Sequence, residues 1–220
     1  EAMADAINEN TRLVFIANPN NPTGTVVGQE AIDRFMARVP DHVVVCFDEA
    51  YFEFLDEPFD TLKFVRENRN VAVLRTCSKI HGLAALRVGY GLCGKNVATI
   101  LQKARQPFNV NAIAQAGALA ALTDDTHVEQ TKAINKEGLA LYEAAFTERG
   151  LEFVPSVANF ILVNVGDGDR VFKDMLKQGV IVRAMRGYKL PGWVRISIGT
   201  PEQNRRCLEV LDSVLAPAGV

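Results

Sequence analysis

A lysine beside two hydroxyl residues gives the first indication of chemistry in this 220-residue sequence. Lys79 follows Thr76 and Ser78, just after the apolar run at residues 71–74, and Arg87 comes eight residues later. A lysine amine can form an imine with an aldehyde, hydroxyls donate to phosphate oxygens, and a guanidinium fits a phosphate. The group suits a phosphorylated aldehyde cofactor, but these residues alone equally allow a solvated turn after a strand.

Two further apolar runs also end in polar residues. Residues 12–17 read as a buried strand and lead into Asn-Pro-Asn-Asn-Pro-Thr-Gly at residues 18–24, a rigid and non-helical turn. Residues 43–47 read as a second strand, with Asp48 and Tyr51 after its end. Because open α/β sheets bind ligands at the carboxyl ends of their strands, the polar groups after all three strands are predicted to lie at one rim.

These segments together resemble the pyridoxal-phosphate aminotransferases of the aspartate aminotransferase fold type. The resemblance rests on the segment at 18–24, on Asp-Glu-Ala-Tyr at 48–51, and on Ser-Lys with an arginine eight residues later. Arg-Gln-Pro-Phe-Asn-Val-Asn at 105–111 and Arg-Ile-Ser-Ile-Gly-Thr at 195–200 are similar to the histidinol-phosphate aminotransferase branch. Four ordered motifs at family spacing, from residue 12 to the C-terminus, are much more specific than any one of them.

An α/β fold is predicted. Between residues 12 and 106 apolar strands alternate with helical stretches, which favours a mostly parallel sheet covered by helices on both faces. A long amphipathic helix is expected from 125 to 149, ended by Gly150, and a small α+β domain follows it. We predict a partial cofactor-binding large domain at 1–122, a connecting helix at 123–149 and a small C-terminal domain at 150–220.

Periodicity and end signals place the individual elements. Helices are expected at 28–38, 59–68, 97–105, 112–122, 169–178 and 201–215, and further strands at 71–74, 88–93, 153–163, 180–183 and 193–198.

The resemblance implies chemical roles for two residues of the rim. Lys79 is expected to hold pyridoxal phosphate covalently and, once released, to carry the proton between the substrate and cofactor carbons. Asp48 is expected to keep the ring nitrogen protonated, so that the ring can accept electrons. For Glu49, a supporting role and a purely structural role remain open.

The resemblance also implies which residues bind the rest of the cofactor. Asn21 and Tyr51 match positions that hydrogen-bond the ring oxygen. Thr76, Ser78 and Arg87 match the phosphate-binding set.

Two arginines of the C-terminal part are expected to bind substrate. Arg195 matches the arginine that binds the α-carboxylate, and burying an arginine in an apolar strand is costly without an anionic partner. Arg183 matches a second substrate arginine, which would face the phosphate of histidinol phosphate. Paired arginines suit a site that binds a phosphate in one half-reaction and the carboxylate of glutamate in the other.

The predicted reaction is transamination between histidinol phosphate and 2-oxoglutarate, giving imidazole acetol phosphate and glutamate in histidine biosynthesis. An aromatic amino-acid aminotransferase and a phosphothreonine decarboxylase of the same fold are alternatives. A truncated, non-catalytic cofactor-binding fragment is another, because family members carry an N-terminal region whose motifs do not occur here. That region supplies further strands, a phosphate-binding helix start and a ring that stacks on the cofactor. A homodimer is expected for the full-length form.

Composition narrows the class of protein. At 48% hydrophobic and 23% charged residues the chain can bury a sizeable core, and a net charge of −2 offers no basic surplus for nucleic acid or membranes. No apolar run approaches membrane-spanning length. The four cysteines are scattered and the three histidines isolated, so we expect no metal site and a reduced, cytoplasmic protein.

Overall fold

The computed structural model describes residues 1–216. The chain forms two compact units: unit 1 contains Glu1–Asn20 and Val26–Val128, and unit 2 contains Asn21–Thr25 and Glu129–Val220. A short loop from the N-terminal half is thus part of the C-terminal unit. The division predicted from the sequence, with boundaries at residues 122 and 149, stays a prediction.

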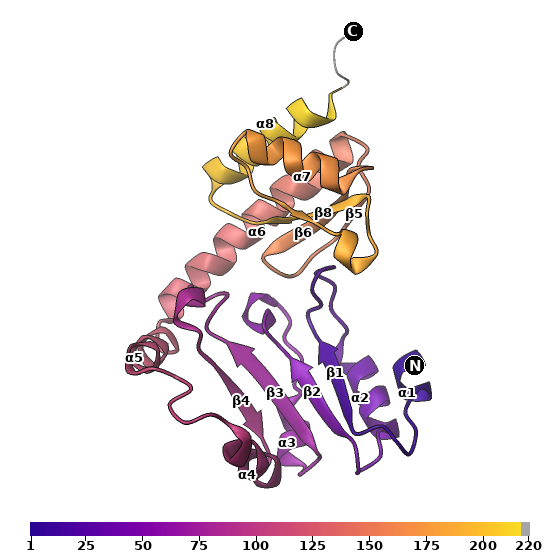
Figure 1. Ribbon diagram of the computed structural model, residues 1–220, viewed down its shortest axis with the longest axis vertical. Helices are drawn as coiled ribbons and strands as arrows, with labels where there is room; N and C mark the ends of the chain where they lie inside the picture. Colours follow the sequence, from indigo (N-terminus) through magenta and orange to yellow (C-terminus); the bar gives the residue numbers. More distant parts are fainter. Residues whose placement is uncertain (217–220) are drawn as a thin grey trace. The chain divides into compact units, whose positions relative to one another are not determined.

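Unit 1 is built on a four-stranded sheet whose strands lie in chain order (Figure 1). Three of them, β1 (Leu13–Ala17), β2 (Val44–Asp48) and β3 (Val71–Thr76), are parallel, and β4 (Gly89–Cys93) runs antiparallel to β3. The mostly parallel sheet predicted from the alternating pattern is confirmed. Its carboxyl ends bring the segments after β1, β2 and β3 to the same edge.

One face of this sheet is closely packed. Val45, Phe47, Val71 and Val73 have no exposed surface, and the Phe47 ring stacks on Phe64 of α3. Buried β-branched and aromatic side chains of this kind stabilise a pleated sheet through packing. The helices of unit 1 are α1 (Ala2–Asp5), α2 (Gln29–Arg38), α3 (Leu62–Arg66), α4 (Lys95–Ala104) and α5 (Ala112–Ala121), with 3-10 turns η1 (Phe52–Phe54) and η2 (Ala84–Leu86).

The opposite face is open along β1. Leu13 and Phe15 alternate with the inward residues of β1 and are 56% and 66% exposed within the described residues. The helix expected at 59–68 is shorter, because Asp60 accepts a hydrogen bond from the Lys63 backbone and the Thr61 hydroxyl bonds a buried carboxylate instead of continuing a helix.

Unit 2 contains an antiparallel sheet in the order β5-β6-β8-β7. Its strands are β5 (Phe153–Val154), β6 (Phe160–Asn164), β7 (Arg183–Ala184) and β8 (Trp193–Ser197). The strand expected at 180–183 begins later, because Gly179 has φ +79° and the Val180 amide bonds Met175 in the turn after a helix.

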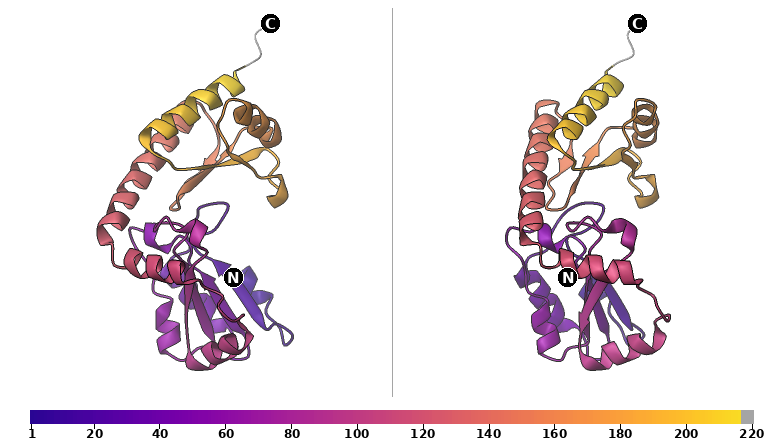
Figure 2. Two further views of the ribbon diagram at one scale, coloured as in Figure 1. Left: turned by 60° about the vertical axis from the view of Figure 1, so that its left-hand side comes forward. Right: turned by 90° about the vertical axis from the view of Figure 1, so that its left-hand side faces the viewer.

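Three helices cover one face of that sheet (Figure 2). They are α6 (Asp125–Glu148), whose first residues belong to unit 1, α7 (Gly168–Lys177) and α8 (Pro201–Leu215). Tyr142, Phe146, Met175 and Leu211 from these helices pack against Ile161 and Ile196 of β6 and β8. The other face of the sheet is therefore the one that can present functional side chains.

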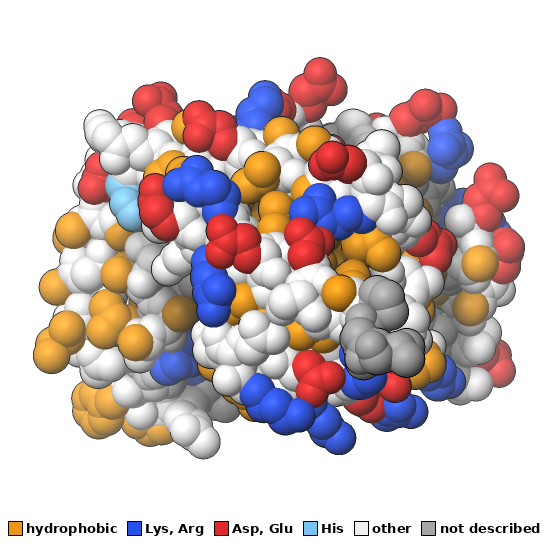
Figure 3. Space-filling model, turned by 90° about the horizontal axis from the view of Figure 1, so that it is seen from above, with side chains coloured by type: hydrophobic (Ala, Val, Ile, Leu, Met, Phe, Trp, Pro, Cys, Tyr) orange, Lys and Arg blue, Asp and Glu red, His pale blue; other side chains and the backbone are white. Residues whose placement is uncertain are grey.

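Charged side chains of both signs are dispersed over one face of the molecule (Figure 3). Lys and Arg alternate with Asp and Glu over the face in Figure 3, in keeping with the small net charge. Within residues 1–216, none of the helices combines the length and apolar character that crossing a membrane requires.

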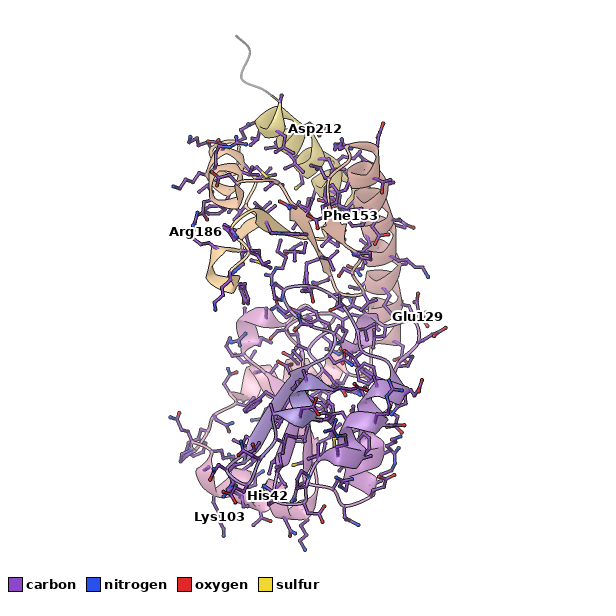
Figure 4. The ribbon with its side chains drawn as sticks, turned by 90° about the vertical axis from the view of Figure 1, so that its right-hand side faces the viewer. His42, Lys103, Glu129, Phe153, Arg186 and Asp212 are labelled. Atoms are coloured by element: carbon purple, nitrogen blue, oxygen red, sulfur yellow. The ribbon has the colours of Figure 1, made fainter. Side chains whose placement is uncertain are left out.

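The ends of α6 and α8 are joined by a two-pronged ion pair. The Arg149 Nε and Nη2 atoms each lie 2.6 Å from an oxygen of Asp212, which Figure 4 labels. Hydrogen bonds and the charge of Arg149 lower the pKa of Asp212. A carboxylate with a lowered pKa in the folded state stabilises the fold above its unfolded pKa, and the effect is lost as the pH falls through the folded value.

We expect Asp212→Asn to lower the free energy of unfolding by about 1 kcal/mol at pH 7, because the pair is partly exposed. At a pH below the folded pKa the wild type also loses the charge, and the difference should nearly vanish. Urea unfolding of both proteins at pH 7 and at successively lower pH values measures this. An Asp212→Asn penalty that stays constant with pH would contradict it.

Candidate active site

The ends of β1, β2 and β3 are locked together by backbone hydrogen bonds. The Asn18 amide donates to the Asp48 carbonyl at 3.0 Å, and the Glu49 amide donates to the Leu74 carbonyl at 2.8 Å. Asp48 is exposed at this end, and its Oδ1 accepts from the Ala50 amide at 3.2 Å. Within unit 1 the ends of β2 and β3 therefore lie side by side, whereas Asn21, which was predicted at the same rim, belongs to unit 2.

Lys79 lies in a tight turn after β3. Cys77 and Ile80, on either side, are almost fully buried and anchor the turn, and the Lys79 carbonyl accepts from the Gly82 amide at 2.9 Å. The half-buried Lys79 places its Nζ 5.2 Å from the ring centroid of Tyr51, which is 5% exposed. The structure thus brings Lys79 and Tyr51 together, from two different strand ends.

Three predicted phosphate ligands also converge. The Ser78 amide donates to Thr76 Oγ1 at 3.1 Å, and Arg87 Nη1 lies 3.5 Å from Ser78 Oγ. Arg87 is in the left-handed region (φ +52°), and its side chain is held by the Ala84 carbonyl at 2.8 Å. An exposed guanidinium beside two hydroxyls has the donors that a phosphate dianion requires.

A buried network lies behind this rim. Glu49 has no exposed surface, receives a hydrogen bond from Thr61, and pairs with Arg75, whose Nη2 is 2.9 Å from Glu49 Oε2. Burial raises the pKa of Glu49, while Thr61 and Arg75 act in the opposite direction. The sequence left Glu49 open between two roles, because Arg75 and Thr61 read only as a strand residue and a helix residue.

The two predicted substrate arginines meet in unit 2. Arg183 and Arg195 are direct cross-strand partners on the sheet face that the helices leave uncovered. Together with Phe172 they line a pocket of about 510 Å³. In the described part of the chain neither has a carboxylate partner, and Arg195 Nε is buried without a hydrogen bond. Two adjacent cations without a counter-ion form a site suited to an anion.

Arg195 also holds Asn21. Its Nη1 atom donates to Asn21 Oδ1 at 2.5 Å, and its guanidinium carbon lies 4.8 Å from the Phe160 ring centroid. With Oδ1 taken, the Asn21 amide nitrogen is the group left to donate to a ligand. The predicted residues therefore fall into two groups: Asp48, Tyr51, Thr76, Ser78, Lys79 and Arg87 in unit 1, and Asn21, Arg183 and Arg195 in unit 2.

Sequence reasoning missed the residue that closes the loop carrying Asn21. Asn18 is 1% exposed, and its side chain donates to the Val27 carbonyl at 2.9 Å and accepts from the Val27 amide at 2.8 Å. An asparagine between a strand and a proline reads as an ordinary turn residue. The two hydrogen bonds that join Asn18 to Val27, nine residues later, could not be recognised from residue spacing.

Comparison with known proteins identifies the family of this chain. The family model described as aminotransferase class I and II matches residues 1–211. The chain belongs to this family. A histidinol-phosphate aminotransferase from Akkermansia muciniphila is 65% identical over 210 residues, which cover 96% of this chain and 58% of that protein. Histidinol-phosphate aminotransferase 2 from Ralstonia nicotianae is 50% identical over 224 residues, covering 99% of this chain and 60% of that protein.

Among solved structures of the family, the fold resembles histidinol-phosphate aminotransferase from Sinorhizobium meliloti in complex with pyridoxal-5'-phosphate. The TM-score is 0.87 at 27% identity, covering 94% of this chain and 58% of that one. The chain spans about three fifths of the length of the curated aminotransferases it matches.

The loop that carries Asn21 depends on a glycine. Gly24 has φ +74°, and a Cβ there would overlap the side chain of Ser156 and lie 2.6 Å from its Cβ. We expect Gly24→Ala to lower the stability of unit 2 by at least about 1–2 kcal/mol, the cost of a left-handed residue with a side chain, before any clash is added.

Gly187 is the matched control, since it has no positive φ and no atom within 4 Å of an added Cβ. Gly187→Ala should change the stability by less than about 0.5 kcal/mol. Chemical unfolding of both variants tests the pair. Equal effects would mean that the Gly24 contact does not hold the loop.

Proposed function

We propose that this protein is a pyridoxal-phosphate-dependent aminotransferase that acts on histidinol phosphate. The amino group would pass to 2-oxoglutarate, giving imidazole acetol phosphate and glutamate in histidine biosynthesis. The names of its relatives support this, and so does the anion site formed by Arg183 and Arg195.

The residues of unit 1 fit the cofactor. Thr76, Ser78 and Arg87 present two hydroxyls and a guanidinium for its phosphate, and Lys79 lies one residue beyond Ser78. Tyr51, whose ring faces the lysine amine, would donate its hydroxyl to the ring oxygen. When bound, pyridoxal phosphate supplies an electron sink for the bonds around the substrate α-carbon.

Lys79 and Asp48 would carry the proton chemistry. Lys79 Nζ would anchor the cofactor covalently and, after the substrate amine takes its place, remove the proton from the α-carbon. Asp48 would keep a proton on the ring nitrogen, since a carboxylate beside that nitrogen favours its charged form. The backbone bonds that fix the ends of β2 and β3 keep these two side chains on adjacent strand ends.

The paired arginines carry the choice of substrate. Histidinol phosphate has a phosphate ester where an amino acid has its α-carboxylate, whereas glutamate brings carboxylates. A single guanidinium suffices for a carboxylate, but two adjacent ones match the higher charge of a phosphate. Direct cross-strand pairing of Arg183 with Arg195, with no acidic partner in the described chain, is the observation that favours a phosphorylated substrate.

The proposal extends to assembly and location. Small-molecule amino donors and 2-oxo acids would be the partners, in a cytoplasmic homodimer of the full-length protein. Unit 1 exposes large apolar side chains that an interface could cover, including Phe108 at 95% and Ile113 at 75%.

An aromatic amino-acid aminotransferase and a phosphothreonine decarboxylase are the competing proposals within the same chemistry.

Replacing Lys79 with alanine should abolish covalent cofactor binding and lower transamination by at least about 10²–10⁴-fold, the contribution typical of a positioned acid–base group. Stability should change little, because the side chain is only half-buried. The measurements are absorbance after borohydride reduction and turnover, in a protein of the length of its relatives. Lys103→Ala, an exposed lysine on α4, is the control. Normal turnover of Lys79→Ala would overturn the catalytic assignment.

Truncation of the two arginines should have different effects on different amino donors. Arg195→Ala should damage the use of glutamate and of histidinol phosphate alike, by roughly 2–5 kcal/mol in transition-state binding for a desolvated charge contact. Arg183→Ala should impair histidinol phosphate more than phenylalanine, because only the former brings a phosphate. The measurement is kcat/KM for all three donors.

Arg186→Ala provides the comparison, because Arg186 is in the next turn but pairs with Asp169 (Figure 4). That variant should leave the ratio between donors unchanged. Should Arg183→Ala lose the same factor on all three donors, an aromatic aminotransferase would become the better assignment.

A further inference from the structure

A buried ion pair joins the two strand ends that carry the proposed catalytic residues. Arg75 is the fifth residue of β3, directly before Thr76, and Glu49 directly follows Asp48 at the end of β2. Arg75 Nε and Nη2 lie 3.0 and 2.9 Å from Glu49 Oε2. Glu49 is fully buried and the Arg75 side chain 16% exposed, so the pair is shielded from solvent.

The pair is on the opposite side of the strands from the proposed cofactor ligands. Because side chains alternate along a strand, Arg75 and Thr76 point to opposite faces, as do Asp48 and Glu49. The strand register places Asp48 beside Leu74, with Thr76 two residues further on the same face. Glu49 and Arg75 therefore hold the two strand ends together on the buried face of the sheet. Asp48 and Thr76 lie on the opposite face.

Further contacts hold this pair in one arrangement. Thr61 donates to Glu49 Oε1, which leaves Oε2 for Arg75, and the Arg75 guanidinium carbon lies 3.7 Å from the Phe52 ring centroid. Phe52 follows Tyr51 directly, so the same guanidinium also contacts the segment that carries Tyr51.

A second carboxylate lies near the same cation. Glu53 Oε2 is buried without a hydrogen-bond partner in residues 1–216. Burial raises the pKa of Glu53 above its usual value, and a backbone hydrogen bond and the charge of Arg75 oppose this only in part. Removing the guanidinium would thus leave two buried carboxylates without their cation, which is a strong constraint on this position.

We propose, on the basis of the function proposed above, that Glu49 and Arg75 are positioning residues: they set the spacing of the β2 end, with Asp48 and Tyr51, relative to the β3 end, with Ser78 and Lys79. A shift of about 1 Å between catalytic groups is enough to cost roughly 10²-fold in rate. Neither residue touches the cofactor or the substrate in this assignment, and each acts through its neighbour in the chain.

The test must separate positioning from stability. A buried ion pair can be replaced by apolar residues of similar volume without loss of stability, whereas removing one partner is destabilising. Arg75→Met should therefore destabilise the protein, and Glu49→Leu with Arg75→Met should restore part of the lost stability, since only Glu53 then remains without its cation. If the pair positions the site, the single and the double variant should both bind pyridoxal phosphate about tenfold more weakly than wild type. Both should also lose about 10²-fold in kcat.

Arg69→Met is the matched control. Arg69 lies just before the other end of β3 and donates to the Met36 and Val39 carbonyls at 3.1 and 2.9 Å, so its loss also disturbs the packing of the sheet. Arg69→Met should lower stability but leave cofactor affinity within about threefold of wild type.

Arg75→Lys keeps the charge without the planar fork and should therefore retain part of the cofactor affinity that Arg75→Met loses. It also provides a variant if Arg75→Met does not fold.

The measurements are unfolding by urea, cofactor titration by absorbance, and kcat, all on the complete holoenzyme and its apo form. Recovery of cofactor affinity together with stability in the double variant would overturn the inference, as would an equal loss of affinity in Arg69→Met. If the wild type binds pyridoxal phosphate and every variant binds it as tightly as the wild type does, this inference is overturned but the proposed function is not. A wild type that binds no pyridoxal phosphate would overturn the proposed function and this inference with it.

Discussion

The parallel pairing of β2 with β3 is the constraint on which the proposed active site depends. Its last hydrogen bond, from the Glu49 amide to the Leu74 carbonyl, continues the ladder beyond the end of β2. A slip of one residue would turn Asp48 into the core and Glu49 outward, because strand side chains alternate. The chemistry of the outer face is therefore specified by the packing of the inner one.

The same rule operates in unit 2. Ile161 and Ile196 pair on the helix-covered face, which fixes Leu162 and Arg195 as partners on the other. Burial of the apolar residues thus supplies the free energy that holds an arginine among apolar neighbours. The pairing of Arg195 with Arg183 follows from the register, and it concentrates positive charge on the face that we propose binds an anionic substrate.

Loop anchoring differs from strand anchoring in the kind of contact used. The segment with Asn21 is held by the Asn18 side chain at its base, by the Val157 amide bonded to the Gly24 carbonyl, and by Arg195 at Asn21 itself. Loops lack a repeating ladder, so their polar groups must be satisfied individually. The consequence is that a single substitution, as at Gly24, can displace the segment that carries Asn21.

The sequence by itself determined the family and the order of the elements, because ordered motifs at family spacing are specific and the apolar runs became strands close to the predicted bounds. The roles of Lys79, Asp48 and the two arginines remain predictions that the same motifs imply. Tertiary structure alone decided which side chains meet. The Glu49–Arg75 pair spans 26 residues and the Asn21–Arg195 contact 174. Such contacts depend on register and packing between distant segments, which local periodicity does not encode.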